Sequence, residues 1–520
     1  MGTAPLDRRS FLAATASGAA GIAVAAGLEG CAGSTAVAPP STQVHPAGGA
    51  TAAQWAAFAA SLTGRLVRPG TPAYATAKLL YDPRFDALAP IGVAYCASPS
   101  DVARSIAFSR THGYRLAVRA GGHSYAGYSS GNGRLVVDVT SMAGVVPAST
   151  PGGAARVGAG ARLIDVYNTL GHRGQLVPGG SCPSVGIAGL TLGGGVGVFA
   201  RRYGLASDNV AAISVVTADG VARRCAAGEN AELYWALRGG GGGNFGVVTS
   251  FEFTTHPLPT VTLFTYDFPW AAARDVLGAW QHWTAALNPA VWSNCQLLSG
   301  DGTTVRVAGV ACASIAQTAA WLAPLLRQVR PTYAFLGGES YQRAMMIEAG
   351  CSALTVAACH LDIAHPPGVL GRQAFLASSS YVRAPMGGAR LGAVVSMVDA
   401  LASELPSLGG GLVFDALGGR VNDLAPTDTA FVHRTYLASI QSSFNWTGAT
   451  PAAQVRAGSA WLERVRTAVY DPSTGAYQNY IDPTLPGWAR AYYGQNLTRL
   501  ASVRASVDPD RVFSFAQSIP

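Results

Sequence analysis

Two reactive side chains, an imidazole and a thiol, occur in loops that are almost free of neighbouring bulk. His123 lies between Gly122 and Ser124, and Cys182 lies in the run 179–183, Gly-Gly-Ser-Cys-Pro. A histidine that only packs is expected on an apolar face, and a structural cysteine is expected in a packed strand. The chain has no CxxC or HExxH motif, which disfavours zinc at these residues. The pattern therefore indicates a role other than packing.

Three glycine clusters accompany these side chains, at residues 121–127, 179–197 and 239–246. Each lies where a strand meets a helix or loop, and such loops let backbone N–H groups approach a pyrophosphate. No cluster is a P-loop, since no Gly-Lys-Ser/Thr follows, and the run 193–197 does not fit GxGxxG. Three such loops together predict an extended, phosphate-bearing ligand.

Several segments resemble those of a known family. They are Arg119–Tyr125 (RAGGHSY), Gly180–Gly186 (GSCPSVG), Leu192–Gly197 (LGGGVG), Gly204–Asp208 (GLASD), Trp235–Thr249 and Tyr492–Pro520. In these motifs the chain resembles the berberine bridge enzyme and glucooligosaccharide oxidase group of the vanillyl-alcohol oxidase/p-cresol methylhydroxylase superfamily. The resemblance spans nearly everything after residue 50.

The resemblance implies FAD as the cofactor, held by two covalent bonds. His123 would bond to the flavin 8α-methyl group and Cys182 to ring carbon 6. In this family, two tethers raise the cofactor's potential and leave an open groove for bulky substrates such as oligosaccharides.

The same resemblance implies hydride transfer to flavin N5 while a tyrosinate takes the substrate's hydroxyl proton. Tyr480, in the motif Tyr477–Tyr480, is the predicted base, and Gln441 is predicted to reach the substrate or the base. A free tyrosine has a pKa near ~10, so the role requires a group that stabilises the phenolate. Val185 matches a position where a small residue lets oxygen reach the flavin, which favours an oxidase over a dehydrogenase. The run 431–441 matches a family strand facing the flavin.

Further residues are assigned to cofactor binding through the resemblance. With His123, Cys182 and Val185 they are Arg119, Gly121, Gly122, Ser124, Tyr125, Gly186, Gly193, Gly194, Gly197, Asp208, Val248, Tyr492 and Asn496. No metal ligand is predicted.

The composition predicts a packed protein of two lobes. The 520 residues exceed the usual size of one domain, and 49% are apolar while only 12% are charged. The formal charge is +8, but no Lys/Arg run interleaved with aromatics occurs after residue 32. This absence disfavours a function in nucleic-acid binding. With the resemblance, this predicts an α+β fold with an FAD-binding lobe and a substrate lobe on an antiparallel sheet.

The predicted domains are an FAD-binding domain over 51–259 with its core at 87–259, a substrate domain over 260–465, and a segment 466–520 that returns to the FAD lobe. The predicted helices cover 51–66, 161–170, 229–238, 319–329, 391–405 and 496–507, together with one that begins in a capping box at Ser98 and ends at Gly113. The predicted strands include 115–119, 247–253, 304–310 and 411–416. Runs 211–216 and 221–225 flank Ala-Asp-Gly, which predicts a hairpin.

The N-terminus predicts export. Asp7–Leu12 (DRRSFL) and the apolar run that follows have the order of a twin-arginine signal over residues 1–32, and 33–50 reads as a linker. Leu28–Cys31 resembles a lipoprotein cleavage box, so a lipid on Cys31 and a purely secreted protein both stay open. Export permits disulfides, and Cys351 with Cys359 is the predicted pair. The isolated Cys96, Cys225, Cys295 and Cys312 are interpreted as small buried hydrophobes.

The leading hypothesis is an exported, FAD-linked oxidase of a carbohydrate alcohol or hemiacetal that makes hydrogen peroxide. Its partners would be a mono- or oligosaccharide, O2 and the twin-arginine machinery. A second hypothesis is a tailoring oxidase of a glycosylated or polycyclic secondary metabolite. A third, an exported binding protein without catalysis, is disfavoured by the intact His123, Cys182 and Tyr480.

Overall fold

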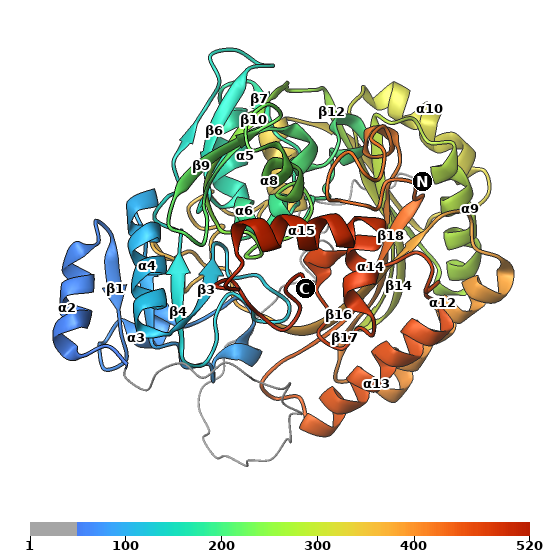
Figure 1. Cartoon of the computed structure of the whole chain (residues 1–520). Coiled ribbons are helices and arrows are strands. Elements are labelled where there is room, and N and C mark those ends of the chain that lie inside the picture. The colour runs from blue at the N-terminus through green and yellow to red at the C-terminus, as the bar shows by residue number, and fades with distance from the viewer. Residues whose placement is uncertain (1–48) are drawn as a thin grey trace.

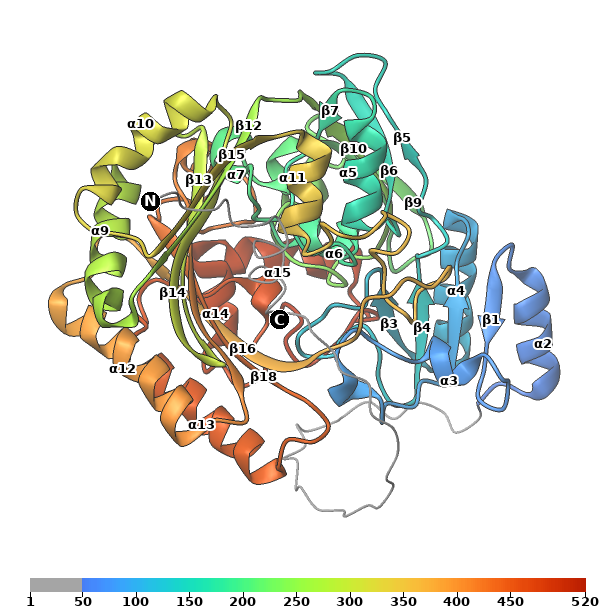
Figure 2. The same cartoon turned by 180° about the vertical axis from the view of Figure 1, so that it is seen from behind.

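The computed structural model describes residues 49–520 of the chain. The predictions for the export signal, for Cys31 and for most of the linker lie outside these residues. Within residues 49–520, no helix is long and apolar enough to cross a membrane. The described chain forms a first lobe of two larger sheets, one two-stranded sheet and short helices, and a second lobe on one large antiparallel sheet (Figures 1 and 2). This arrangement confirms the predicted two-lobed α+β fold.

The first lobe begins with a four-stranded sheet of order β1-β2-β4-β3. Its elements are α2 (Ala52–Ser61), β1 (Arg65–Val67), α3 (Tyr74–Ala77), β2 (Gly92–Tyr95), α4 (Pro99–His112), β3 (Arg115–Arg119) and β4 (Arg134–Asp138). Strands β2 and β3 both run parallel to β4, and α4 forms the crossover between β2 and β3. Because His123 follows β3 by only a few residues, this sheet fixes where its loop begins.

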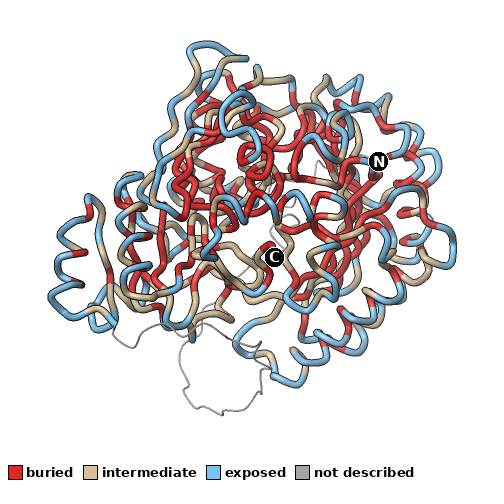
Figure 3. The backbone as a smooth tube through the Cα atoms, viewed as in Figure 1, coloured by how far each residue is buried: buried red, intermediate tan, exposed pale blue. Residues whose placement is uncertain are grey.

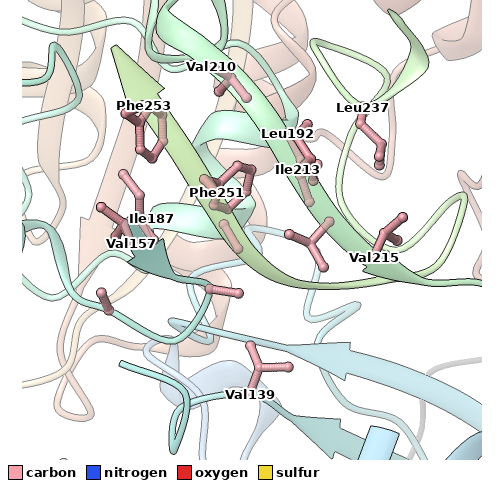
Figure 4. Close-up of a cluster of buried hydrophobic side chains, with 14 of the residues drawn as sticks. Val139, Val157, Ile187, Leu192, Val210, Ile213, Val215, Leu237, Phe251 and Phe253 are labelled. Carbon is pink, nitrogen blue, oxygen red and sulfur yellow. The ribbon is translucent and has the colours of Figure 1, made fainter. Parts of the chain in front are cut away.

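An antiparallel five-stranded sheet of order β5-β6-β10-β8-β9 completes the first lobe. The elements in this region are β5 (Val145–Val146), β6 (Ala154–Gly158), α5 (Leu163–Gly171), β7 (Gln175–Leu176), α6 (Ile187–Leu192), α7 (Ala200–Tyr203), β8 (Val210–Val216), β9 (Ala222–Ala226), α8 (Ala231–Ala236), β10 (Val247–Thr254) and β11 (His256–Pro257). Ile187 and Leu192 of α6 are buried in the same core as Val157, Ile213 and Phe251 of the sheet (Figure 4). This packing anchors the helix that follows the Cys182 loop.

The second lobe is a seven-stranded antiparallel sheet of order β15-β12-β14-β13-β17-β18-β16. Its elements are β12 (Val261–Phe268), α9 (Ala273–Ala285), β13 (Val291–Gly300), β14 (Gly302–Ala311), α10 (Ile315–Leu326), β15 (Tyr333–Glu339), α11 (Tyr341–Glu348), β16 (Ala374–Val382), α12 (Gly388–Glu404), β17 (Gly409–Ala416), β18 (Ala438–Trp446) and α13 (Ala452–Ala468). Helices α9, α10, α12 and α13 lie on its outer side, whereas α11 lies beside α5 on the side of the first lobe (Figure 2).

The two faces of this sheet differ in chemistry, because successive residues of a strand point to opposite faces. In β17, Leu412 and Phe414 are buried in the apolar core beneath the outer helices. Val413 and Asp415 alternate with them and are only half-buried. Figure 3 shows the buried core strands and the exposed outer helices of this lobe. We call the face that carries Val413 and Asp415 the inner face.

The segment 476–520 packs against the first lobe. It contains α14 (Trp488–Tyr493) and α15 (Leu497–Val507), and α15 lies beside α8. The Tyr493 hydroxyl donates to the Gly240 carbonyl at 3.2 Å, and the Ile519 N–H donates to Asn244 Oδ1 at 3.0 Å. The third glycine cluster is therefore held by the middle and by the C-terminal end of this segment.

Three local predictions need correction. The helix predicted over 51–66 ends at Ser61, and residues 65–67 form β1, which pairs with β2. Ser98 caps α4, but no capping box forms, because the Asp101 carboxylate accepts instead from the N–H groups of Thr63, Gly64 and Ala97. Burial alone would raise the pKa of Asp101, and these donors lower it. The strand predicted over 431–441 begins only at Ala438.

Other local predictions are confirmed. Strands β8 and β9 form the predicted antiparallel hairpin. Cys351 and Cys359 form the predicted disulfide, with a Cα–Cα distance of 5.9 Å. Cys96, Cys225 and Cys295 are buried and unpaired, as expected for small hydrophobes, while Cys312 is only partly buried.

Candidate active site

The loops that carry His123 and Cys182 pack backbone to backbone. A methyl group on Gly121 would overlap the Gly186 nitrogen, and one on Gly186 would overlap the Gly121 nitrogen, so only glycine fits at either position. This contact brings His123 Nε2 to 3.0 Å from the Ser184 hydroxyl. His123 is thus hydrogen-bonded to the loop that holds Cys182, two residues from the thiol.

The environment of the His123 ring favours its neutral form. It stacks on Tyr81, with ring centroids 4.2 Å apart. Burial and the nearby charge of Arg162 lower its pKa to about 3, so the imidazole is neutral at physiological pH. Nε2 is used by Ser184, while Nδ1 has no partner among residues 49–520. If Nε2 donates to Ser184, the Nδ1 lone pair is free to form a bond.

Cys182 is the only exposed free cysteine among residues 49–520, as predicted for its turn. Protein atoms nevertheless surround it, and this burial raises the pKa of the thiol. Its charge in the ionised form would raise the pKa of Tyr81, the residue stacked on His123. The thiol of Cys182 and the imidazole of His123 therefore both influence the same residue, Tyr81.

The three glycine clusters meet although they are far apart in sequence. The N–H groups of Gly239 and Gly241 both donate to the Leu192 carbonyl, which joins the third cluster to the second. Side chains at Gly193 and Gly197 would overlap Asn479 and the Gly179 carbonyl. Backbone is thus packed more closely here than any larger residue would permit.

A buried cation lies at the junction of the first two clusters. Arg162 Nη1 has no hydrogen-bond partner among the described residues, and a methyl on Gly121 would lie 3.0 Å from it. Burial lowers the pKa of Arg162, and the charges of Asp138 and Asp165 act against that effect. An unpaired buried guanidinium indicates a missing anionic ligand.

Tyr480 and Gln441, the predicted catalytic residues, are linked through Tyr125. Gln441 Nε2 donates to the Tyr125 hydroxyl at 3.0 Å. The Tyr125 ring stacks on Tyr480 with centroids 5.5 Å apart and planes 9° apart. Gln441 comes from the inner face of β18, Tyr125 from the His123 loop and Tyr480 from the segment 476–520, so three distant parts of the chain converge.

The neighbouring Tyr477 fastens this motif to the glycine loop. Its hydroxyl oxygen accepts from the N–H groups of Gly195 at 3.0 Å and Val196 at 3.3 Å, and from Asn479 Nδ2 at 2.9 Å. Its ring contacts Tyr480 edge-on with centroids 5.0 Å apart. The position of Tyr480 is therefore fixed relative to the second glycine cluster.

The stabiliser expected for a Tyr480 phenolate does not occur among the described residues. Burial raises the pKa of Tyr480 well above its usual value, and a charge on Asp415 raises it further. Burial also raises the pKa of Asp415 to about 7. Near neutral pH, Asp415 is thus the neighbour of Tyr480 that can accept or release a proton.

Several residues assigned to cofactor binding have their polar groups occupied within the protein. Arg119 pairs with Asp138, and Asp208 pairs with Arg434. The Asn496 amide donates to carbonyls that include Pro426 O at 2.7 Å. The Tyr492 hydroxyl accepts from Asp482 N, Ser124 Oγ accepts from Tyr128 N, and Val248 is buried in the core. Any contact of these residues with the cofactor stays a prediction.

Sequence reasoning missed Arg162, Ser184 and Asp415. Arg162 and Ser184 belong to the glycine-rich region but carry no motif of their own. Asp415 lies in the predicted strand 411–416, where a lone carboxylate among apolar residues was the available signal.

Comparison with known proteins identifies the fold's relatives. Residues 90–226 match the family described as "FAD binding domain", and residues 476–520 match "Berberine and berberine like". The FAD-linked oxidoreductase YvdP of Bacillus subtilis, itself uncharacterised, is 30% identical over 88% of this chain and 98% of its own length. The chain belongs to the berberine bridge enzyme-like family of FAD-linked oxidoreductases.

Other family members resemble the chain over most of its length. The carbohydrate oxidase of Microdochium nivale is 27% identical over 83% of this chain and 88% of its own. The solved structure of berberine bridge enzyme-like 1 from Physcomitrella patens superposes with a TM-score of 0.79 at 28% identity, covering 89% of this chain and 98% of that one. Membership makes the chain an FAD-linked oxidase.

The residues present fit the family's cofactor. The glycine clusters leave backbone at the surface of the site, and Arg162 offers an unpaired buried positive charge. A pyrophosphate or another anionic part of FAD would satisfy that charge.

Proposed function

We propose that this protein is an exported oxidase that holds FAD by two covalent bonds and oxidises a hemiacetal or alcohol of a carbohydrate. In this proposal His123 Nδ1 bonds to the flavin 8α-methyl group and Cys182 Sγ bonds to ring carbon 6. Export rests on the twin-arginine pattern at residues 1–32, and Cys31 is a candidate for lipidation.

The arrangement of His123 and Cys182 is the observation that carries the proposal. His123 is neutral, its Nε2 is held by Ser184 and its Nδ1 is free. Cys182 is exposed on the same loop as Ser184. A free imidazole nitrogen and a reachable thiol on adjoining loops, beside an unpaired Arg162, are the groups that a double attachment requires.

The chemistry would divide between the cofactor and the side chains. Bound FAD would accept the hydride and deliver the electrons to O2. Over one turnover the substrate's C–H and O–H bonds become a C=O group, and its two electrons and two protons convert O2 into H2O2. For a hemiacetal carbon, the product is a lactone.

Tyr480 is the group that would take the substrate's hydroxyl proton. Its high pKa means that it holds a proton in the resting site, so it must pass that proton on as it receives the substrate's. Asp415, whose pKa burial raises to about 7, is the neighbouring acceptor. Gln441 holds the Tyr125 hydroxyl, and Tyr125 stacks on Tyr480, so these two residues position the base.

A carbohydrate substrate is supported by family relatives and by the polar inner face of the sheet. The Microdochium nivale relative is named a carbohydrate oxidase. Opposite register partners point to the same side, so Asn294 and Ser439 flank Asp415, and Gln296 and Gln441 flank Val413. Amide, hydroxyl and carboxyl groups in such a row can bind sugar hydroxyls.

The attachment is tested by mass spectrometry of peptides containing residues 123 and 182, prepared from protein expressed with ample riboflavin. We expect one peptide pair cross-linked by FAD. Two unmodified peptides would overturn the double attachment.

The activity is tested by peroxide release and O2 uptake across mono- and oligosaccharides. We expect H2O2 in proportion to oxidised sugar. A yellow enzyme that consumes no O2 with any sugar would overturn the carbohydrate assignment and favour a tailoring oxidase of a secondary metabolite. Flavin that no reductant bleaches would favour a binding protein.

A further inference from the structure

The segment 349–373, which we call the strap, runs from α11 to β16 by way of the first lobe (Figure 2). The disulfide between Cys351 and Cys359 closes its first half. Backbone hydrogen bonds hold its second half to the first, since Leu370 N donates to His360 O at 2.9 Å. The strap is therefore a closed unit with internal bonds rather than a free loop.

The loop that carries Cys182 is attached to the first turn of α5. The N–H groups of Leu163 and Ile164 donate to the carbonyls of Val185 and Pro183, at 3.0 and 3.2 Å. Among residues 49–520 no side chain caps this helix, so the loop satisfies N–H groups that a helix N-terminus leaves free. With only nine residues, α5 is too short to be stable by itself. Tertiary contacts must therefore hold α5, and the position of the thiol follows that of the helix.

The strap packs against the same first turn of α5. Ile164 is buried in one apolar cluster with the two half-cystines of the strap. His360 Nε2 lies 3.0 Å from Asp165 Oδ2, and this hydrogen bond raises the pKa of the His360 ring. The disulfide end of the strap thus fixes the turn whose N–H groups hold the Cys182 loop.

The other end of the strap reaches the neighbours of His123. Arg372 Nε donates to Leu80 O at 2.7 Å, and both terminal nitrogens of Arg372 pair with the Asp86 carboxylate. Leu80 directly precedes Tyr81, whose ring stacks on His123. The two ends of the strap therefore contact the supports of the two loops by separate routes.

We propose that the strap positions Cys182 and His123 for attachment of the flavin, its disulfide end acting on the thiol and its Arg372 end on the imidazole. The inference rests on the double attachment of the proposed function. His360 and Arg372 are then positioning residues, which act through α5 and through Tyr81. Each attachment replaces one S–H or N–H bond of the protein and one C–H bond of the flavin by a single bond. The two electrons and two protons that each attachment releases pass to O2.

Positioning matters because each bond forms only when the two reacting atoms are correctly placed. A displacement of ~1 Å can lower a rate by about 10²-fold. Cys182 should depend on the strap more strongly than His123, because His123 also follows closely on β3 and is bonded to Ser184. A strap that only stabilised the fold would lower the free energy of unfolding without changing which residue carries flavin.

The test measures attachment at each residue in protein expressed with ample riboflavin in a host with an oxidising cytoplasm. Mass spectrometry of proteolytic peptides gives the fraction of residues 123 and 182 that carries flavin. In C351S/C359S, which removes the disulfide without leaving a thiol, we expect the fraction for Cys182 to fall by about tenfold or more. His123 should stay attached. The unaltered chain made in a reducing cytoplasm, where the disulfide does not form, should show the same selective loss.

Three further variants complete the test. R372M should lower attachment at His123 and spare Cys182, so it and the disulfide variant are controls for each other. H360N keeps the disulfide and loses only its bond to α5, so it should reduce attachment at Cys182 by less. R464M removes an exposed ion pair on the outer helix α13 and should leave both attachments unchanged.

The outcomes separate this inference from the proposed function. Wild-type protein with flavin on both residues, together with strap variants that keep both attachments, overturns the inference alone. Equal loss at both residues in every strap variant also overturns it, because that result indicates general destabilisation. Wild-type protein with neither residue modified overturns the double attachment and this inference with it.

Discussion

The two walls of the candidate active site are specified in different ways. The loop wall consists of the glycine clusters with His123 and Cys182, each of which lies in a short motif that can be recognised in the sequence. The sheet wall consists of residues such as Asp415 and Gln441, which become neighbours only through strand register. The residues of the cofactor side can therefore be recognised from local motifs, while the substrate side depends on how distant strands align.

The largest effect should come from removing both side chains of the loop wall to which the proposed function assigns covalent bonds, those of His123 and Cys182. In the variant H123A/C182A we expect complete loss of covalently held flavin, because no other exposed free thiol exists in residues 49–520. Acid precipitation followed by absorbance of pellet and supernatant measures this. The control C312A removes a partly buried thiol, and its flavin absorbance should stay in the precipitated pellet. Flavin that stays with the double variant's pellet would contradict the loop wall's role.

Tyr480 lies where the loop wall and the sheet wall meet, so its substitution tests whether the two walls act together in catalysis. In Y480F we expect kcat to fall by ~10²- to 10⁴-fold, the usual range for loss of a general acid–base group, with flavin content unchanged. Y74F is the control, because the Tyr74 hydroxyl donates to Pro90 O in the loop that precedes β2 of the first sheet. A loss of kcat smaller than about tenfold would mean that a residue other than Tyr480 acts as the general base.

Two neighbouring residues of β17 that face opposite sides of the sheet test the difference between its two faces. Phe414 is 1% exposed in the apolar core, so F414A should lower the free energy of unfolding by about 3 to 5 kcal/mol. V413A, on the inner face, should cost roughly 1 kcal/mol and mainly change KM. Denaturant unfolding and steady-state kinetics measure the pair. Equal losses of stability would show that the inner face is packed like the outer one.

The effect that is smallest at neutral pH concerns a buried histidine. His433 is buried, stacks on Tyr381, and its Nε2 lies 3.1 Å from Tyr492 O. Burial lowers its pKa to about 3. The unfolded chain takes up a proton below about pH 6.5 that the folded chain refuses, so His433 lowers stability as pH falls from there toward 3, by about 1.4 kcal/mol per pH unit.

The measurement for His433 is the free energy of unfolding between pH 6.5 and 4 for the wild type and H433N. The variant should show a slope shallower by about one proton. H172N, which replaces an exposed histidine, should keep the wild-type slope. An unchanged slope in H433N would mean that the folded protein protonates this ring.

The sequence allowed the loop wall and the fold class to be predicted because glycine motifs and strand patterns are local signals. It did not reveal that the charge of Asp415 acts on Tyr480, since this effect depends on the register of β17 and on the docking of the segment 476–520. The helix predicted over 51–66 extended too far, because apolar periodicity cannot show that Arg65–Val67 pairs with β2. Arg162 was missed because only its burial without a partner distinguishes it.

The closure of the first lobe by the segment 476–520 sets an order of events during biosynthesis. A ribosome releases residues 121 and 182 long before Asn479 can rest against Gly193 or Ile519 can bond to Asn244. A nascent chain therefore carries His123 and Cys182 on an unfinished first lobe. The full set of contacts around the glycine clusters forms only when translation is almost complete.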